Sequence, residues 1–184
     1  MPDNQLRPEV EVGSPGFRVI FRNFRFSFKR RRHDVFLAVP MATLKNAAEA
    51  DRHKEIVHIA RTAVSKSCKT NRIFYAGDRA STRDDFDPSD QALAQNRSEM
   101  SAAKSFLMIL ELERRTSVLV EAGMALGLGR PSLYMIKSKK NLPYLLREAG
   151  QASRQQGLPL IRIHQYSTDK ELAKGIEDIM PSML

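Results

Sequence analysis

Short apolar runs alternate with longer amphipathic stretches from Asp34 to the end of the chain. We interpret five of the runs as strands, over residues 35–39, 73–76, 105–110, 133–136 and 159–163. Strands that are apolar on both faces and separated by helices specify a parallel sheet covered on both sides. The pattern therefore predicts an α/β domain with a doubly wound, mainly parallel five-stranded sheet.

The stretches between these strands carry helix start and stop signals. Asp87 followed by Pro88 is typical of an N-cap and first helical residue, and Gly129 is typical of a helix end. Thr168 with Glu171 three residues later predicts a capping box for the last helix. A further short helix is expected over residues 141–148.

The first 33 residues follow a different pattern. Residues 1–16 contain two proline-containing turns and little apolar surface, so we expect a mobile tail. In residues 17–33 phenylalanines alternate with other residues, with one change of phase, and this period of two indicates an appended strand or hairpin. The domain itself is expected to span residues 34–184.

The charge is concentrated in the same extension. Residues 17–33 hold seven Lys and Arg and no acid, which accounts for most of the net charge of +9. Two interpretations stay open: an edge strand or hairpin whose arginines face water, or a contact with nucleic acid, a membrane surface or another anionic polymer.

Several classes of protein and site are disfavoured by composition. No apolar run is long enough to span a bilayer and the start does not look like a signal peptide, so a cytoplasmic protein is expected. Cys68 is the single cysteine and the four histidines have no zinc-binding spacing, so we expect no metal site, with His53 and His58 in solvent. Neither GxGxxG nor GxxxxGK[ST] occurs, so no dinucleotide cofactor or P-loop chemistry is expected.

Ligands of doubly wound sheets bind beyond the carboxyl ends of the strands. Glu121 lies about one turn into the helix that follows the third strand, where the helix dipole would favour its ionised form. Such a carboxylate serves covalent attack on a sugar carbon, hydrogen bonding to ribose, or helix stability alone. Gly123, two residues later, costs about 1 kcal/mol relative to alanine and calls for close packing or ligand approach.

Three segments carry a resemblance to known families: VFLAVPM (residues 35–41), EMSAAKSFLMILE (99–111) and TSVLVEAGMALGLGRP (116–131). They resemble the nucleoside 2-deoxyribosyltransferase-like and TIR-like families over roughly residues 34–137. The resemblance implies a flavodoxin-like or TIR-like sheet and matches Glu121 to the catalytic glutamate of those families. It also implies cleavage of an N-glycosidic bond, and a homo-oligomer, because related sites are often completed across a subunit interface.

The expected site follows from the loops and from the resemblance together. Catalytic roles are predicted for Glu121, Glu111 and Asp78. Substrate contacts are predicted for Pro40, Met41, Gly77, Arg79, Arg115, Thr116, Ser117 and Gly123.

The sequence also departs from the family pattern. Glu111 stands where an aspartate usually ends the third strand, and Lys104 stands where one often precedes it. Arg114 and Arg115 replace glycine or aspartate before the helix, which favours an anionic ligand.

Three functional hypotheses follow. The first is an enzyme that hydrolyses or transfers across the N-glycosidic bond of a nucleotide such as a nucleoside 5'-monophosphate or NAD. The second is a sensor or adaptor that binds a nucleotide signal without chemistry, which the departures at Glu111 and Lys104 favour. The third is an effector held on a membrane or nucleic acid by residues 17–33.

Overall fold

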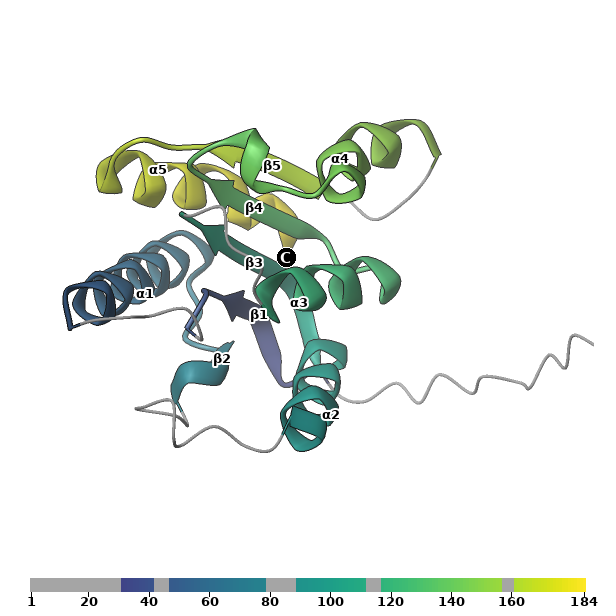
Figure 1. The fold of residues 1–184 in the computed structure, drawn as a ribbon, viewed down its shortest axis with the longest axis horizontal. Coiled ribbons are helices and arrows are strands. Elements are labelled where there is room, and N and C mark those ends of the chain that lie inside the picture. The colour runs from purple at the N-terminus through teal and green to yellow at the C-terminus, as the bar shows by residue number, and fades with distance from the viewer. Residues whose placement is uncertain (1–30, 42–46, 79–88, 112–116, 157–160) are drawn as a thin grey trace, which may run out of the picture.

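One all-parallel sheet forms the centre of the structure, a computed structural model that describes residues 31–41, 47–78, 89–111, 117–156 and 161–184. Its five strands lie in the order β2-β1-β3-β4-β5 (Figure 1). They are β1 (His33–Ala38), β2 (Ile73–Tyr75), β3 (Ala103–Leu110), β4 (Ser132–Ile136) and β5 (Ile161–Gln165). The prediction of a doubly wound α/β fold is confirmed.

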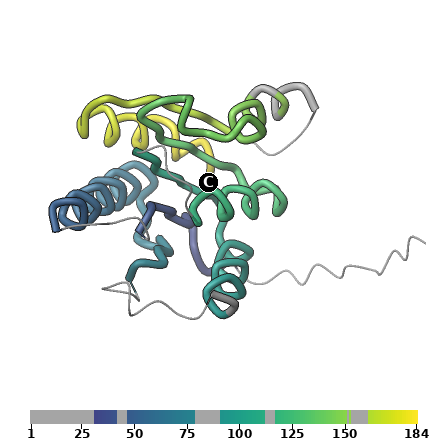
Figure 2. The backbone as a smooth tube through the Cα atoms, in the orientation of Figure 1, coloured from purple at the N-terminus to yellow at the C-terminus, as the bar shows by residue number. Residues whose placement is uncertain are grey.

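Helices cover both faces of this sheet (Figures 1 and 2). One face carries α1 (Ala47–Cys68) and α5 (Asp169–Ile179), and the other carries α2 (Ser89–Ser101), α3 (Ser117–Gly127) and α4 (Tyr144–Gln156). Short 3-10 turns are η1 (Ala76–Asp78), η3 (Lys139–Asn141) and η4 (Met180–Met183).

Alternate residues of the central strand enter two separate cores. In β3, Leu107 and Ile109 pack toward α1 and α5, while Phe106 and Met108 pack toward α2, α3 and α4. All four side chains are fully buried. This two-sided burial explains why the strand reads as a continuous apolar run in the sequence.

Two predicted helix ends are confirmed. Gly129 adopts a left-handed φ of 65°, and the Arg130 amide donates to the Ala125 carbonyl at 2.9 Å, which closes α3 as a Schellman motif does. At the start of α5 the Thr168 hydroxyl accepts from the Glu171 amide at 3.2 Å. Asp87 and Pro88 lie outside the described residues.

Two expected boundaries were wrong. The helix expected over residues 141–148 is α4, which begins at Tyr144, directly after Pro143, and continues to Gln156. Helix propensity alone did not reveal this length, because α4 passes through Gly150 and glycine is a poor helix former. The strand expected over residues 159–163 is β5, Ile161–Gln165, because its pairing with β4 and not its apolar run sets its limits.

The amino end of the sheet is held by a buried charge cluster around Asp34. The Lys104 ammonium lies 2.7 Å from Asp34 Oδ1, and the Thr70 hydroxyl donates to Oδ2 at 2.5 Å. Burial alone would raise the pKa of Asp34, but these two hydrogen bonds and the charges of Lys104 and Arg72 hold it below its ordinary value. Lys104 therefore lies at the edge opposite the expected site and has a structural role.

The amino-terminal extension is described only from Arg31 onward, so the predicted tail and most of the predicted strand lie outside the described residues. β1 begins at His33, one residue before the expected boundary. Glu99, which is buried, accepts hydrogen bonds from Arg32 at 3.0 Å and from His33 at 2.8 Å. These contacts join the start of β1 to α2.

Lys104→Met is expected to lower the free energy of unfolding by about 2 kcal/mol at neutral pH, because Asp34 would keep a buried charge with one fewer partner. The pKa of Asp34 is lower in the folded state than its unfolded value of 3.8. Ionised Asp34 therefore contributes to the free energy of unfolding above pH 3.8, and this contribution is lost as the pH falls through the folded pKa. Urea unfolding at pH 7 and pH 3 measures both effects. Lys54→Met on the exposed face of α1 is the control, and an equal loss in both variants would contradict the prediction.

Candidate functional site

The candidate site lies at the carboxyl ends of β1 and β3, where the chain leaves toward opposite faces of the sheet. α1 follows β1 on one face and α3 follows β3 on the other (Figure 1). This divergence is the switch point at which doubly wound folds bind ligands. Residues 42–46, 79–88 and 112–116 are not described, so the predicted contacts Arg79, Arg115 and Thr116 lie outside the described part of the chain.

Glu121 is the buried carboxyl group of this edge. It is the fifth residue of α3 and is only 6% exposed. The Asn96 side-chain amide, from α2, donates to Glu121 Oε1 at 2.8 Å. Asn96 was not predicted as a site residue, because nothing in the sequence of α2 shows that it packs beside α3.

Burial raises the pKa of Glu121 to about 7. The expectation that the helix dipole keeps this group ionised was wrong, because α3 begins at Ser117 and Glu121 falls beyond its first turn, where the dipole acts. An amide donor is a weaker counterpart for a carboxylate than a cation. Glu121 therefore changes its charge near neutral pH, as catalytic carboxyl groups often do.

Glu111 forms its side-chain contacts on the other face of the sheet. The Arg52 guanidinium from α1 donates to Glu111 Oε1 at 2.9 Å, and the Tyr166 hydroxyl donates to the same oxygen at 3.3 Å. Arg52 also binds Asp169 at the start of α5, with Nη1 at 2.7 Å from Oδ2. The Lys137 ammonium lies 3.7 Å from Glu111 Oε1. Glu111 thus belongs to a network that joins β3, α1 and α5.

Asp78 has a third, separate set of contacts. It lies in η1 and forms an ion pair with Arg61 of α1, with its side chain about half exposed. Among the described residues, each of the three predicted catalytic carboxyl groups therefore has a different main partner: Asn96, Arg52 or Arg61.

Met41 and Gly77 are brought together at the ends of β1 and β2. A Cβ at Gly77 would lie 2.5 Å from Met41 Sδ and closer still to the ring of Tyr75, so only glycine fits. The Tyr75 hydroxyl contacts His53 Nε2 of α1. His53 is half-buried and was wrongly expected in solvent, whereas His58 is exposed as expected.

Ser117 and Gly123 lie on the exposed side of α3. A Cβ at Gly123 would meet no described atom within 4 Å, so close packing against the sheet does not explain this glycine. Ligand approach at Gly123 stays a prediction.

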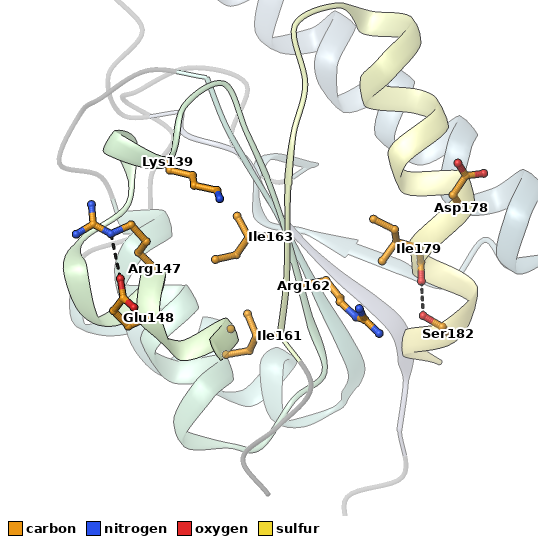
Figure 3. Close-up of a pocket in the computed structure, with 10 residues that line it drawn as sticks. Lys139, Arg147, Glu148, Ile161, Arg162, Ile163, Asp178, Ile179 and Ser182 are labelled. Carbon is orange, nitrogen blue, oxygen red and sulfur yellow. Dashed lines mark hydrogen bonds and ion pairs between the residues drawn. The ribbon is translucent and has the colours of Figure 1, made fainter. Parts of the chain in front are cut away.

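A groove lined by described residues lies away from this edge, along β5 (Figure 3). It has a volume of about 760 Å³ and runs between α4 on one side and α5 with η4 on the other. Two interactions lie within its lining: the Arg147 guanidinium lies 3.4 Å from Glu148 Oε1, and the Ser182 hydroxyl donates to the Ile179 carbonyl at 2.8 Å. The groove does not contain the predicted site residues.

The described residues lack two further features, a metal-binding cluster and a membrane-spanning helix. They contain no group of three or more His, Cys, Asp and Glu side chains placed to hold a metal ion. None of the described helices combines the length and apolar character that crossing a bilayer requires.

Comparison with solved structures identifies a similar fold. The structure titled CMP N-glycosidase, BcmB, from Clostridium botulinum matches with a TM-score of 0.57 at 17% sequence identity. The match covers 78% of this chain and 97% of that chain. Models of protein families give no match, and a search of curated proteins gives none either. The chain therefore shares the α/β fold of an N-glycosidase.

Glu121→Gln is expected to stabilise the protein at pH 8 by up to about 3 kcal/mol, because it removes a charge that burial disfavours. The pKa of Glu121 is about 7 in the folded state and 4.5 ordinarily, so this group loses its proton at lower pH in the unfolded chain. The free energy of unfolding of the wild type therefore falls as the pH rises from 4.5 to about 7. The gain should vanish near pH 4, where both states carry the proton. Urea unfolding at the two pH values tests this, with Glu148→Gln as control. A gain that does not depend on pH would contradict the prediction.

Proposed function

We propose that the protein cleaves the N-glycosidic bond of a nucleotide, with Glu121 as the catalytic carboxylate. The observation that carries the proposal is the burial of Glu121 beside the switch point, with an amide donor and a pKa of about 7. The shared fold with a CMP N-glycosidase supports a nucleoside 5'-monophosphate as the first substrate to test, and the family resemblance adds NAD.

Glu121 would meet positive charge at the sugar. When the bond between C1' and the base nitrogen breaks, its electron pair leaves with the base, which takes up a proton, and C1' becomes an oxocarbenium-like centre. The ionised Glu121 would attack or stabilise this carbon, and water or a second base would then complete hydrolysis or transfer. Asn96 holds Oε1, which leaves Oε2 to face the sugar.

The substrate contacts are proposed around this carboxylate. Pro40, Met41 and Gly77 would border the site at the ends of β1 and β2. An anionic phosphate group suits Arg79 and Arg115, together with Thr116 and Ser117 at the start of α3. The predicted contact at Gly123 lies on the exposed side of α3, about half a turn round the helix from Glu121, so it would meet an outer part of the ligand.

The roles of the two other carboxylates are more limited in this proposal. Glu111 is held by Arg52 and Tyr166. We therefore propose that it positions the sugar hydroxyls or the end of β3, and that it does not transfer a proton. Asp78 would act from η1, where its exposed ion pair with Arg61 can exchange for a substrate hydroxyl.

The alternative of a sensor without chemistry has lost part of its support. The departures at Lys104 and Glu111 favoured it, and Lys104 binds Asp34 at the amino ends of the strands, away from the site. A sensor and an enzyme differ in whether free base appears, so the tests below separate them.

Glu121→Gln should lower base release by orders of magnitude while substrate binding survives, because the amide keeps shape and hydrogen bonding but cannot stabilise an oxocarbenium ion. Purified protein is incubated with the four ribonucleoside monophosphates, their deoxy forms and NAD, and free base is separated by chromatography. Calorimetry measures binding of the same compounds.

Glu148→Gln on α4 is the control and should release base as the wild type does. A fully active Glu121→Gln variant would exclude the catalytic role. If the wild type binds a nucleotide and releases no base, the sensor hypothesis replaces the enzyme.

The dependence of kcat/KM on pH should report the ionisation of Glu121. Because the reactive form is the carboxylate, kcat/KM should rise about tenfold per pH unit below pH 7 and level off above it. Initial rates from pH 5 to pH 9 at low substrate concentration measure this limb. A rate that falls through pH 7 would instead assign Glu121 as a proton donor.

A further inference from the structure

We propose that His53 and Tyr75 are a positioning pair for this reaction: His53 fixes the Tyr75 hydroxyl and the turn after β1 at the border of the site that contains Glu121. The inference rests on the proposed function, and it concerns residues outside the set predicted from the sequence. His53 comes from α1 and Tyr75 ends β2, so their side-chain contact joins this helix to the end of β2.

The contacts of His53 define what the pair can hold. Nε2 meets the Tyr75 hydroxyl, and the imidazole also hydrogen-bonds the backbone of Pro40. Proline has no N–H, so the ring must donate to the Pro40 carbonyl. A neutral imidazole satisfies both partners, since one nitrogen donates to the carbonyl and the other accepts from the phenol.

The surroundings keep the imidazole neutral. Burial lowers the pKa of His53, and the Pro40 carbonyl offsets this only in part. Burial likewise raises the pKa of Tyr75, so the phenol keeps its proton and remains a donor. With a neutral imidazole and a protonated phenol, both partners of His53 are satisfied when Tyr75 donates to His53 and His53 donates to Pro40.

Tyr75 also lies within the electrostatic field of the catalytic carboxyl group. After burial and the charge of Asp78, the charge of Glu121 contributes to its raised pKa. The ring occupies the space that Gly77 leaves open beside Met41, and the Arg61 guanidinium lies 5.5 Å from its centroid. The phenol is thus held at the ends of β1 and β2, beside Met41 and Gly77.

Packing alone does not require this polar pair. Replacing both members of a buried hydrogen bond by apolar groups of similar shape is often nearly neutral for stability. A Phe at position 75 would fill the same space. The hydroxyl and the imidazole therefore point to a task that packing cannot supply, and the adjacent turn carries two predicted substrate contacts, Pro40 and Met41.

The test is a double-mutant cycle in kcat and KM with the full-length protein. The variants are His53→Leu, Tyr75→Phe and the double variant, measured with the monophosphate that the wild type cleaves best. Exposed residues provide matched controls: His58→Leu on α1 and Tyr144→Phe on α4. Thermal melting of every variant verifies folding, and Tyr75→Phe keeps the test valid if His53→Leu does not fold.

We expect kcat to fall by about 10- to 100-fold in each single variant, with KM changed less than threefold, because misplacement of a positioned group costs up to about 10² in rate. The double variant should lose no more kcat than either single variant, which would show that the two residues act as a unit. Its melting temperature should stay close to that of the wild type. The controls should match the wild type.

Two results would overturn the inference, and they are distinguishable. If the wild type releases base and Tyr75→Phe and His53→Leu do so at the rate of the controls, the positioning role is wrong and the proposed function stands. If the wild type releases no base from any nucleotide, the proposed function fails and the positioning role fails with it. A loss of kcat that follows only the loss of melting temperature would also contradict the inference.

Discussion

The common direction of the five strands is the constraint from which the rest of the structure follows. Parallel neighbours cannot be joined by a tight turn, so each strand must be followed by a crossover, and helices come to cover both faces. The parallel direction also places the carboxyl ends of all five strands at the same edge of the sheet. The carboxyl ends of β1, β2 and β3 therefore lie at this edge, and the opposite edge holds structural contacts such as that of Asp34 with Lys104.

Asp34 and Glu121, two buried carboxyl groups at opposite ends of the strands, differ in their partners. At the amino end, Asp34 is buried with a cation and a hydroxyl, and its ionised form is favoured. At the carboxyl end, Glu121 is buried with an amide alone, and its ionised form is disfavoured. A carboxyl group that costs stability in its charged form is typical of sites where function has set the residue. The contrast within one sheet supports a chemical role for Glu121.

Much of the fold could be predicted from the sequence, because apolar runs and helix-capping residues act locally. The Gly129 helix end and the Thr168 cap are of this kind, and both are present. The limits of β5 were missed because its pairing with β4 sets them, and the length of α4 was missed because the helix continues through Gly150. The site shows the same division. Glu121 stood out as an acid in an apolar helix, whereas its partner Asn96 and the pair of His53 with Tyr75 depend on which helices become neighbours.

The groove along β5 has a consequence for the behaviour of the protein in concentrated solution. β5 is the last strand of the sheet, and within the described residues nothing pairs with its outer edge. Free edges invite strands of other molecules and so promote aggregation. Arg162 projects from the middle of this strand, exposed and beside the α5 end of the groove, and α4 and α5 rise on either side. A charged side chain with a helix on each side discourages pairing with a strand of another molecule. The outer side of β5 is therefore protected against aggregation.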